Sequence, residues 1–499
     1  MRTTQAIIEY FDNLSEQRKN EILNTPTLVK ISGTSYFVSA SGDDSNDGLS
    51  ESTPWKTLDK VSSFCFSAGD GVFFKRGDVF RGHFNCKSDV TYSAYGEGDK
   101  PKFFGWEKDL ANPELWECVY PENNIWKLKE KILDCGTLVF NHGESCSYKL
   151  IPSFYDGKFY CRENEEKEFN LKEEAVRDLD IYWHFDEVLT TARSEETCAI
   201  PVPQISDKSM GDLYLRCDKG NPGDVFSSIE AASARNLICV SLAHNVTIDN
   251  LCIKYVGCHA ISGGGHVKGL TVKNCEIGWI GGAIQCYYGD DPNYKLMNKR
   301  GRVTRFGNGV EIYGGCTDYE VSNCYFYEIY DAAMTHQITT CGNPVVMENI
   351  TYKDNLVENA VYSIEYFLDT DERDTVSFME NINISGNILR KAGYGWGNHR
   401  PNKDTPAHIK GWNFINRAKN YTVENNIFDR SSHRLIHIVA ESEESMPVMD
   451  NNTYIQNSGR LLGSFGTDGF SPDFFGEPSK QIINEKYGDK NAKVYNLEL

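Results

Sequence analysis

The sequence lacks the long apolar segments that mark membrane proteins. Its 499 residues contain no run of about 18 consecutive apolar side chains, so we expect no membrane-spanning helix. The opening stretch, MRTTQAIIEYFDNLSEQRKNEIL, also lacks the uninterrupted apolar core of a secretory signal. We therefore expect a cytoplasmic protein, or a secreted protein whose signal peptide is missing from this sequence.

Positive charge is also scarce. The chain has 51 Lys and Arg against 71 Asp and Glu, which gives a formal net charge of −20, and no stretch is rich in Lys or Arg. An acidic surface repels nucleic-acid phosphates and anionic lipids. We therefore expect no nucleic-acid partner and no membrane partner, and the sequence leaves the oligomeric state open.

The cysteines lack the spacing of a metal or redox site. There are 16 of them, but none are arranged as C-x-x-C. Because no secretory signal is visible, free thiols in a reducing compartment are a better interpretation than a disulfide scaffold. The sequence predicts no cofactor.

One turn has half the pattern of a calcium loop. In GDDSNDG, Asp43, Ser45 and Asp47 alternate before Gly48, but the position where a calcium loop needs glutamate is Pro54. An Asx-rich turn is the favoured interpretation. Calcium stays the minor alternative.

A repeated pattern is present after about residue 236. The segments NVTIDNLCI, GLTVKNCEI, DYEVSNCYF, ITYKDNLVE, INISGNILR and YTVENNIFD align, with 24, 49, 32, 32 and 39 residues between successive asparagines. Periods of about 20–50 residues are typical of solenoids. The sequence therefore predicts an all-β fold, a right-handed parallel β-helix. The aligned asparagines are Asn250, Asn274, Asn323, Asn355, Asn387 and Asn426.

The alignment predicts two stacked columns. The asparagines would form an amide ladder at a tight bend, because Asn tolerates the backbone that such a bend requires. The residues that follow them would form one buried apolar column, and the spacing of 49 would hold either two turns or one turn with an insertion. The apolar column would be Leu251, Cys275, Cys324, Leu356, Ile388 and Ile427.

Changes of texture along the chain divide it into five parts. An amphipathic helix near the start is expected to cap an open end of the stack, since a solenoid needs its ends covered. The segment after the first coils has scattered tryptophans and charged stretches without a visible repeat. The parts are a helical cap (1–30), first coils (31–105), an inserted β-rich subdomain (106–225), the main β-helix (226–470) and a C-terminal tail or cap (471–499).

A second column, about ten residues after each asparagine, is polar on one side. It comprises the segments HAIS, GAIQ, AAMT, YSIE and LIH. Successive strand residues point to opposite faces, so the apolar residues would point inward and their neighbours outward. The outward set would be Ser262, Gln285, Thr335, Glu365 and His437.

Three carboxylates near that face are the catalytic candidates: Glu311, Asp331 and Glu365. Cleavage of a glycosidic bond needs a proton donor and a second carboxylate, about 5 Å apart for retention of configuration or about 6.5–9.5 Å apart for inversion. Adjacent β-helix coils provide nearly that separation. The acids could equally be solvated surface residues.

Aromatic and basic residues near the same face are candidates for substrate binding. Aromatic rings stack on sugar faces, and Arg or His bind hydroxyls or carboxylates. Many of them lie in the stretch GYGWGNHRPNKDTPAHIKGW, which is expected to be a loop followed by a strand. The candidates are His336, Asp369, Trp396, His399, Arg400, Lys410, His437 and Tyr287.

Several segments resemble a known group of enzymes. YFVSASGDDSNDG and GDGVFFKRGDVFRG resemble the opening of pectate-lyase-like β-helix proteins, and NPGDVFSSIEAA, GNGVEIYGG and IYDAAMTHQ resemble β-helix glycoside hydrolases of the family 141 type. The resemblance covers most of residues 36–465. It implies a hydrolase with paired acids on the β-helix face, here Asp331 and Glu365, with Glu311 as the substitute.

Three functions remain open on the sequence alone. The first is a glycoside hydrolase acting on an oligo- or polysaccharide. The second is a polysaccharide lyase or uronate epimerase, which needs a base and a cation to neutralise a carboxylate; Lys410, Arg400 and His336 could serve. The third is a non-catalytic carbohydrate-binding β-helix.

Overall fold

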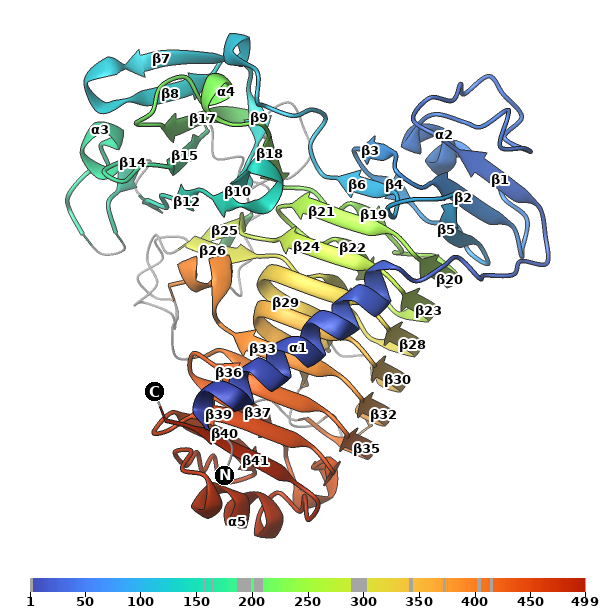
Figure 1. Cartoon of the computed structure of the whole chain (residues 1–499), viewed down its shortest axis with the longest axis vertical. Helices are drawn as coiled ribbons and strands as arrows, with labels where there is room; N and C mark the ends of the chain where they lie inside the picture. Colours follow the sequence, from blue (N-terminus) through green and yellow to red (C-terminus); the bar gives the residue numbers. More distant parts are fainter. Residues whose placement is uncertain are drawn as a thin grey trace.

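The chain folds as a right-handed parallel β-helix, as the repeats predict. Strands of successive coils stack in parallel along one axis, and a separate β-rich unit projects from one end of the stack (Figure 1). This computed structural model describes residues 3–155, 158–162, 165–185, 199–201, 210–288, 303–340, 344–370, 374, 376–401, 405–412 and 416–498.

One wall of the stack is a parallel sheet. Within the described residues it contains ten strands, and each pairs in register with the next coil. In order along the stack they are β1 (Ser35–Val38), β2 (Gly71–Lys75), β5 (Thr91–Tyr95), β20 (His244–Asp249), β23 (Val267–Lys273), β28 (Cys316–Ser322), β30 (Val346–Lys353), β32 (Phe378–Ser385), β35 (Ala418–Glu424) and β38 (Val448–Asp450).

The remaining strands of the coils form two further parallel rows, and the long strands β29 (Tyr325–Thr339) and β31 (Leu356–Asp369) belong to both. The first row also contains β21 (Cys252–Val256), β24 (Glu276–Ile280), β33 (Ile388–Ala392), β36 (Ile427–Ser431), β39 (Thr453–Asn457) and β41 (Lys493–Leu497). The second also contains β22 (Ile261–Gly264), β27 (Val310–Tyr313), β34 (Ala407–Gly411), β37 (Arg434–Val439) and β40 (Leu461–Gly466).

Apolar columns fill the interior between these walls. Val272, Val321, Tyr352, Ile384 and Val423 lie in register on consecutive strands and are fully buried. Burying a large aliphatic side chain stabilises a fold by about 1.5–3 kcal/mol. Because strand side chains alternate, the same packing fixes which residues point outward.

The bend that the asparagines mark is real in the first coils. Asn250, Asn274 and Asn323 adopt left-handed backbone there, with φ of 64°, 55° and 49°. In the next coil, however, the left-handed residue is Asp354, with φ of 56°, and not the predicted Asn355. The predicted alignment is therefore wrong by one residue in the later coils.

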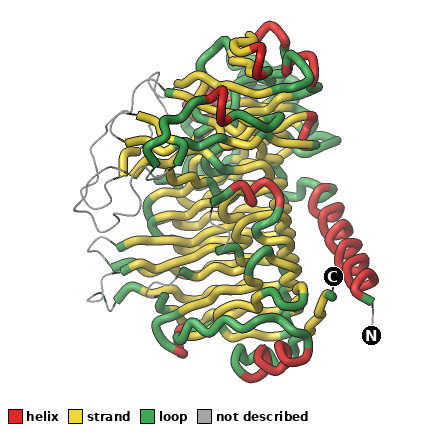
Figure 2. Tube along the Cα trace, turned by 90° about the vertical axis from the view of Figure 1, so that its left-hand side faces the viewer, coloured by secondary structure: helices red, strands yellow, loops and turns green. Residues whose placement is uncertain are grey.

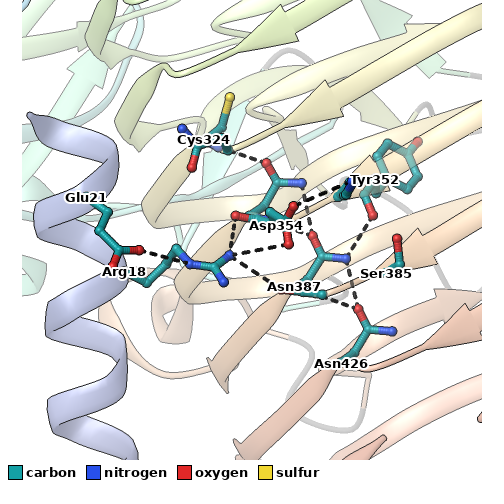
Figure 3. A network of polar contacts seen from close by, with 12 residues as sticks. Arg18, Glu21, Cys324, Tyr352, Asp354, Ser385, Asn387 and Asn426 are labelled. Carbon is teal, nitrogen blue, oxygen red and sulfur yellow. Dashed lines mark hydrogen bonds and ion pairs between the residues drawn. The ribbon is translucent and has the colours of Figure 1, made fainter. Parts of the chain in front are cut away.

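In these coils the amide ladder lies one position after the left-handed bend residue (Figure 3). Asn355 accepts from the backbone N–H of Cys324 at 2.9 Å and donates to Asn387 at 3.0 Å, and Asn387 donates to Asn426 at 2.9 Å. The predicted apolar column is therefore not continuous, because the buried asparagines, and not Leu356, Ile388 and Ile427, follow Cys324 along the stack. The residues Leu356, Ile388 and Ile427 begin the next strands, in register with Tyr325.

The N-terminal helix α1 (Thr4–Leu23) forms as predicted but does not cap an end. It lies lengthwise along the side of the stack (Figures 1 and 2). Phe11 packs with Leu497 near the last coil, and Arg18 donates to the carbonyl oxygen of Asp354 at 2.6 Å. The expectation of a cap is wrong because the outer face of the coils offers the helix a long apolar strip.

A C-terminal helix covers the last coil. This helix, α5 (Glu477–Glu485), lies at the C-terminal end of the stack (Figure 1). Its Ile483 is buried in the main core, and Tyr487 stacks on Phe465 with ring centroids 4.6 Å apart. In the part of the chain that the structure describes, no helix has the length and apolar character needed to cross a membrane.

The β-rich insertion forms its own sheet and joins the stack. Its strands are β7 (Trp116–Tyr120), β8 (Ile125–Leu128), β9 (Ile132–Leu133), β12 (Tyr148–Lys149), β15 (Asp180–His184) and β17 (Met210–Arg216). The strand β10 (Cys135–Phe140) connects it to the coils by pairing with β18 (Ile229–Ser233). At the junction, Lys149 forms a buried ion pair with Asp134, whose other oxygen accepts from the backbone N–H of Ile284 at 2.6 Å.

The long spacing of 49 residues is one coil with an insertion. β22 pairs directly with β27, and β24 pairs with β29, so no coil lies between them. The extra chain leaves the coil as β25 (Ala283–Tyr288) and returns antiparallel as β26 (Val303–Phe306). The strand β16 (Ala199–Pro201), from the insertion, adds to this hairpin.

Candidate active site

A cavity of about 690 Å³ lies over the second row of strands. Its floor is formed by β22, β27 and the second halves of β29 and β31, and the β25–β26 hairpin forms one wall. Its lining includes Asn236, His259, Ser262, Gly264, Gln285, Arg305, Asn308, Glu311, Tyr313, Asp331, Gln337, Thr339, Glu365, Phe367, Arg400 and Trp412. All three predicted catalytic acids thus line one cavity.

The outward polar column exists, with one correction. Ser262 is in register with Glu311, and Thr335 is in register with Glu365 and then with Lys410. The predicted member Gln285 is not in this column, because its strand leaves the coil for the hairpin. Glu311 occupies that place.

Glu311 is a buried carboxyl that is held by two donors. Its side chain accepts from Asn308 at 2.6 Å and from Thr335 at 2.7 Å, and the residue is 7% exposed. Burial raises the pKa of Glu311 to about 7, and the nearby Asp331 adds to the rise, although both hydrogen bonds lower it. A large fraction of Glu311 is therefore protonated near neutral pH.

Glu365 is a similarly buried carboxyl on β31, two strands along the stack from Glu311. It accepts from Gln337 at 2.8 Å and from the indole N–H of Trp412 at 2.5 Å, and it is 6% exposed. Burial raises the pKa of Glu365 to about 8, and Asp331 raises it further, while Trp412 and Arg400 lower it. At neutral pH this side chain is mostly a neutral acid that can donate a proton.

Asp331 differs from the two glutamates because it has a cation as its partner. It lies where the β29–β31 register shifts, and its carboxylate forms an ion pair with Arg400. Arg400 also lies over the ring of Tyr362, 5.6 Å from its centroid. Burial lowers the pKa of Arg400, but Asp331 together with Tyr362, Tyr330 and Glu365 outweighs burial and raises it, so the guanidinium stays charged. The site thus combines neutral carboxylic acids with one ion-paired carboxylate.

Asn308 connects several parts of the site. Its side-chain oxygen accepts from the backbone N–H of Ala332, next to Asp331, at 2.7 Å, while its amide donates to Glu311. Its backbone N–H donates to Nδ1 of His259 at 3.1 Å. Burial lowers the pKa of His259 to about 4, so the imidazole is neutral and carries its proton on Nε2.

Two predicted substrate-binding residues are buried away from the cavity, so those predictions are wrong. His336 is 0% exposed; its Nδ1 lies 2.9 Å from the hydroxyl of Tyr352, and its ring stacks on Tyr366. The alternation that points Thr335 outward turns His336 into the core. Trp396 is 3% exposed, and its indole donates to the carbonyl oxygen of Glu328 at 2.7 Å.

Other predicted residues lie beside the cavity rather than in its lining. Lys410 is in register between Glu365 and His437, and its Nζ lies 4.2 Å from the ring centroid of Trp412. Asp369 follows at the end of β31, where its carboxylate lies 3.5 Å from the hydroxyl of Thr339. These residues stay candidates for contact with a longer substrate.

Two more predicted residues belong to neighbouring parts. His399 packs against Tyr148 of the insertion, with ring centroids 4.6 Å apart. The side chain of Tyr287 lies outside the described residues, although its backbone pairs with Val303 in the hairpin. Among the predicted binding residues whose side chains are described, Arg400 alone lines the cavity.

The half-pattern of a calcium loop forms Asx turns. Asp43 accepts from the backbone N–H of Ser45 at 2.8 Å, and Asp47 accepts from that of Leu49 at 3.0 Å. Within the residues that are described, no group of three or more His, Cys, Asp or Glu is arranged to hold a metal ion. The thirteen cysteines whose side chains the structure describes all have free thiols.

No family model matches the sequence. The lacto-N-biosidase of Bifidobacterium longum subsp. longum is 40% identical over 82 residues, which cover 14% of this chain. The chain spans only 5% of the length of that curated relative.

Similar solved structures include three carbohydrate-related proteins. XylC in complex with xylose is 11% identical, with a TM-score of 0.41; the match covers 93% of this chain and 83% of the XylC chain. The GH136 lacto-N-biosidase from Eubacterium ramulus is 13% identical, with coverages of 99% and 70% and a TM-score of 0.39. The polygalacturonase from Erwinia carotovora ssp. carotovora is 10% identical, with coverages of 95% and 96% and a TM-score of 0.31. The resemblance to family 141 stays a prediction.

Proposed function

We propose that this protein is a glycoside hydrolase that cleaves an oligo- or polysaccharide in the cavity over β27, β29 and β31. One observation carries the proposal: Glu365, a buried carboxyl whose pKa is raised to about 8, shares a cavity with Asp331, a carboxylate that is ion-paired with Arg400. A neutral acid beside an ionised carboxylate is the pair that glycoside hydrolysis requires. The 82 residues that are 40% identical to a lacto-N-biosidase support the same class of reaction.

The roles follow from the charge states. Glu365 would donate its proton to the glycosidic oxygen as the bond from that oxygen to the anomeric carbon breaks. Asp331 would stabilise the positive charge that develops at the anomeric carbon, either by attacking it or by activating a water molecule. Water then supplies the hydroxyl of the new sugar end, and its second proton restores the acid.

Glu311 is the alternative partner of Glu365. The strand of Thr335 lies between them, so their Cα atoms are about 9.6 Å apart if neighbouring strands are about 4.8 Å apart. Side chains that lean toward each other across this span would leave room for a sugar ring and a water molecule. A direct role for Glu311 would therefore resemble inversion more than retention.

A lyase or epimerase has less support at this site. The base and the cation that such an enzyme needs were expected to be His336, Lys410 and Arg400. His336 lies in the core, Lys410 is not part of the lining, and Arg400 is ion-paired with Asp331. These positions do not favour abstraction of a proton next to a substrate carboxylate.

A screen of neutral and uronate-containing oligosaccharides, including lacto-N-biosides, tests the proposal. Products are read by mass spectrometry and by ultraviolet absorption. Hydrolysis adds the mass of water across the broken bond and creates no new absorption, as expected here. An unsaturated, absorbing product would identify a lyase, and binding without any cleavage would identify a carbohydrate-binding protein; either result would overturn the proposal.

A further inference from the structure

A second outward column runs beside the acids, two residues further along each strand. Gly264 is in register with Tyr313, Tyr313 with Gln337, and Gln337 with Phe367. Trp412 follows Phe367 in the column, because Tyr366 and Gly411, the residues that precede Phe367 and Trp412, are paired. All five members of this column line the cavity: Gly264, Tyr313, Gln337, Phe367 and Trp412.

Three members of this column are aromatic and reach the surface. Tyr313 is 46% exposed, an unusual state for a large ring on a rigid strand, and Phe367 and Trp412 are partly exposed. The rings of Tyr313 and Phe367 are 6.3 Å apart at an angle of 70°. The hydroxyl of Tyr313 donates to Thr339 at 3.1 Å, which fixes the orientation of its ring.

The dimensions of the column suit a chain of sugars. Tyr313 and Trp412 are three strands apart, or about 14 Å if neighbouring strands are about 4.8 Å apart. The column lies two residues from the acids, about 6.7 Å along the strand. A saccharide that rested on these rings would therefore place one of its linkages beside Glu365 and Glu311.

The charges of the lining indicate which saccharide would fit. Among the described lining residues, Arg305 and Arg400 are the arginines, and no lysine joins them. Arg305 donates to the carbonyl oxygens of Gly282 and Gly136 and lies over the ring of Tyr330, while Arg400 pairs with Asp331. Both guanidiniums are thus engaged by the protein, and the remaining Asp, Glu and His residues of the lining are the three acids and the neutral His259. A uronate would find no dedicated cationic partner there.

We propose that Tyr313, Phe367 and Trp412 form a stacking subsite for the neutral pyranose units of an oligosaccharide, immediately beside the acids. The apolar C–H faces of such sugars would cover the exposed rings, and Gln337 would provide hydrogen bonds to hydroxyl groups. This inference rests on the proposed function for what is cleaved, but sugar binding can be measured without cleavage.

The test measures binding in the Glu365→Gln background, so that no probe is consumed. Titration calorimetry compares lacto-N-tetraose and xylotetraose, which are neutral, with tetragalacturonate, which is polyanionic. At least one neutral probe should bind more tightly than tetragalacturonate. Tyr313→Ala and Phe367→Ala should each weaken that binding by about threefold to tenfold, the range expected for loss of one aromatic stacking contact.

Two controls separate stacking from general damage. Tyr313→Phe keeps the ring and should keep the affinity, and Phe470→Ala removes an aromatic side chain that is 43% exposed outside the cavity and should change nothing. Preference for tetragalacturonate, unchanged binding in both alanine variants, or binding of no probe would overturn the subsite. Hydrolysis by the wild-type protein is assayed separately: cleavage with unaltered KM in the alanine variants refutes only the subsite, and ring-dependent binding without cleavage refutes only the hydrolase.

Discussion

The indole N–H of Trp412 donates to Oε1 of Glu365 at 2.5 Å, although 47 residues separate them in the sequence. Burial raises the pKa of Glu365, and this hydrogen bond opposes the rise because it stabilises the charged carboxylate. Trp412 therefore adjusts the acid strength of the residue that we propose as the proton donor.

Replacing Trp412 with phenylalanine should change the pH dependence of turnover. In the wild-type protein, activity that requires protonated Glu365 should fall above about pH 8. Trp412→Phe removes the donor, so the pKa of Glu365 rises and the alkaline limb of the kcat profile moves to higher pH. A profile that keeps its alkaline limb would contradict a link between this hydrogen bond and the proton donor.

The raised pKa of Glu365 also predicts how stability depends on pH. A carboxyl whose folded pKa exceeds its unfolded value binds more protons when folded, so the free energy of unfolding falls as pH rises from about 4.5 to about 8. Glu365→Gln removes this loss. It should be more stable than wild type at about pH 9, by on the order of 1–3 kcal/mol, and show no such gain below about pH 4.5.

Urea unfolding at both pH values measures this difference. Glu358→Gln is the matched control, because Glu358 is on the same strand but outside the cavity, where it pairs with Arg390 at 3.1 Å. It should show no gain at alkaline pH. Equal behaviour of the two variants would mean that the environment of Glu365 is not the cause.

The ion pair between Asp331 and Arg400 should show strong coupling. Arg400→Met leaves a largely buried carboxylate without its partner, and we expect a loss of about 3 kcal/mol in the free energy of unfolding. Adding Asp331→Asn removes the stranded charge and should recover most of that loss. A double-mutant cycle from chemical denaturation gives the coupling, and simple additivity of the two changes would contradict the pair.

The buried amide ladder should contribute more to the free energy of unfolding than similar amides on the outer surface do. Asn387→Ala breaks contacts to Asn355, Asn426 and the carbonyl oxygen of Tyr352, so we expect a loss of about 2–4 kcal/mol. The control Asn383→Ala loses two bonds on the partly exposed outer face, one to Thr422 at 2.9 Å and one from Ser385 at 2.6 Å, and should cost about 1 kcal/mol. Equal losses in thermal unfolding would argue against the ladder.

The repeats predicted the fold because the same physical requirement recurs in every coil. Each turn needs a residue that tolerates a left-handed bend, followed by buried side chains, and the pattern is visible without a structure. The exact register was not visible, because asparagine serves two purposes. Asn250 makes the bend itself, while Asn387 lies one position later in the buried ladder, so matching letters shifts the later coils by one residue.

The site was predictable where alternation along a strand decides it. Glu365 points outward as expected, and His336 points inward for the same reason. Glu311 occupies the outward place that was predicted for Gln285. What the sequence could not provide were contacts made by chain that leaves the coils. Gln285 lies in a hairpin that projects from the coil, and Trp396 is buried, with its indole N–H bonded to the carbonyl oxygen of Glu328.

Some members of the site had weak signals or none. His259 begins the repeated segment HAIS and Asn308 lies in a short connection, but the repeats do not reveal their roles, which depend on backbone hydrogen bonds. Trp412 follows the strand of Lys410 and stands out in the sequence only as one more aromatic residue. Extending the outward column by two residues would have identified it together with Tyr313.

The most direct test of the account is the turnover of two isosteric variants on a cleaved oligosaccharide. Glu365→Gln and Asp331→Asn should each lower kcat by about 10²-fold or more, the usual range for loss of an acid–base group, while Glu358→Gln should keep wild-type kcat. Wild-type turnover in both cavity variants would contradict the central claim that these two carboxyl groups perform the cleavage.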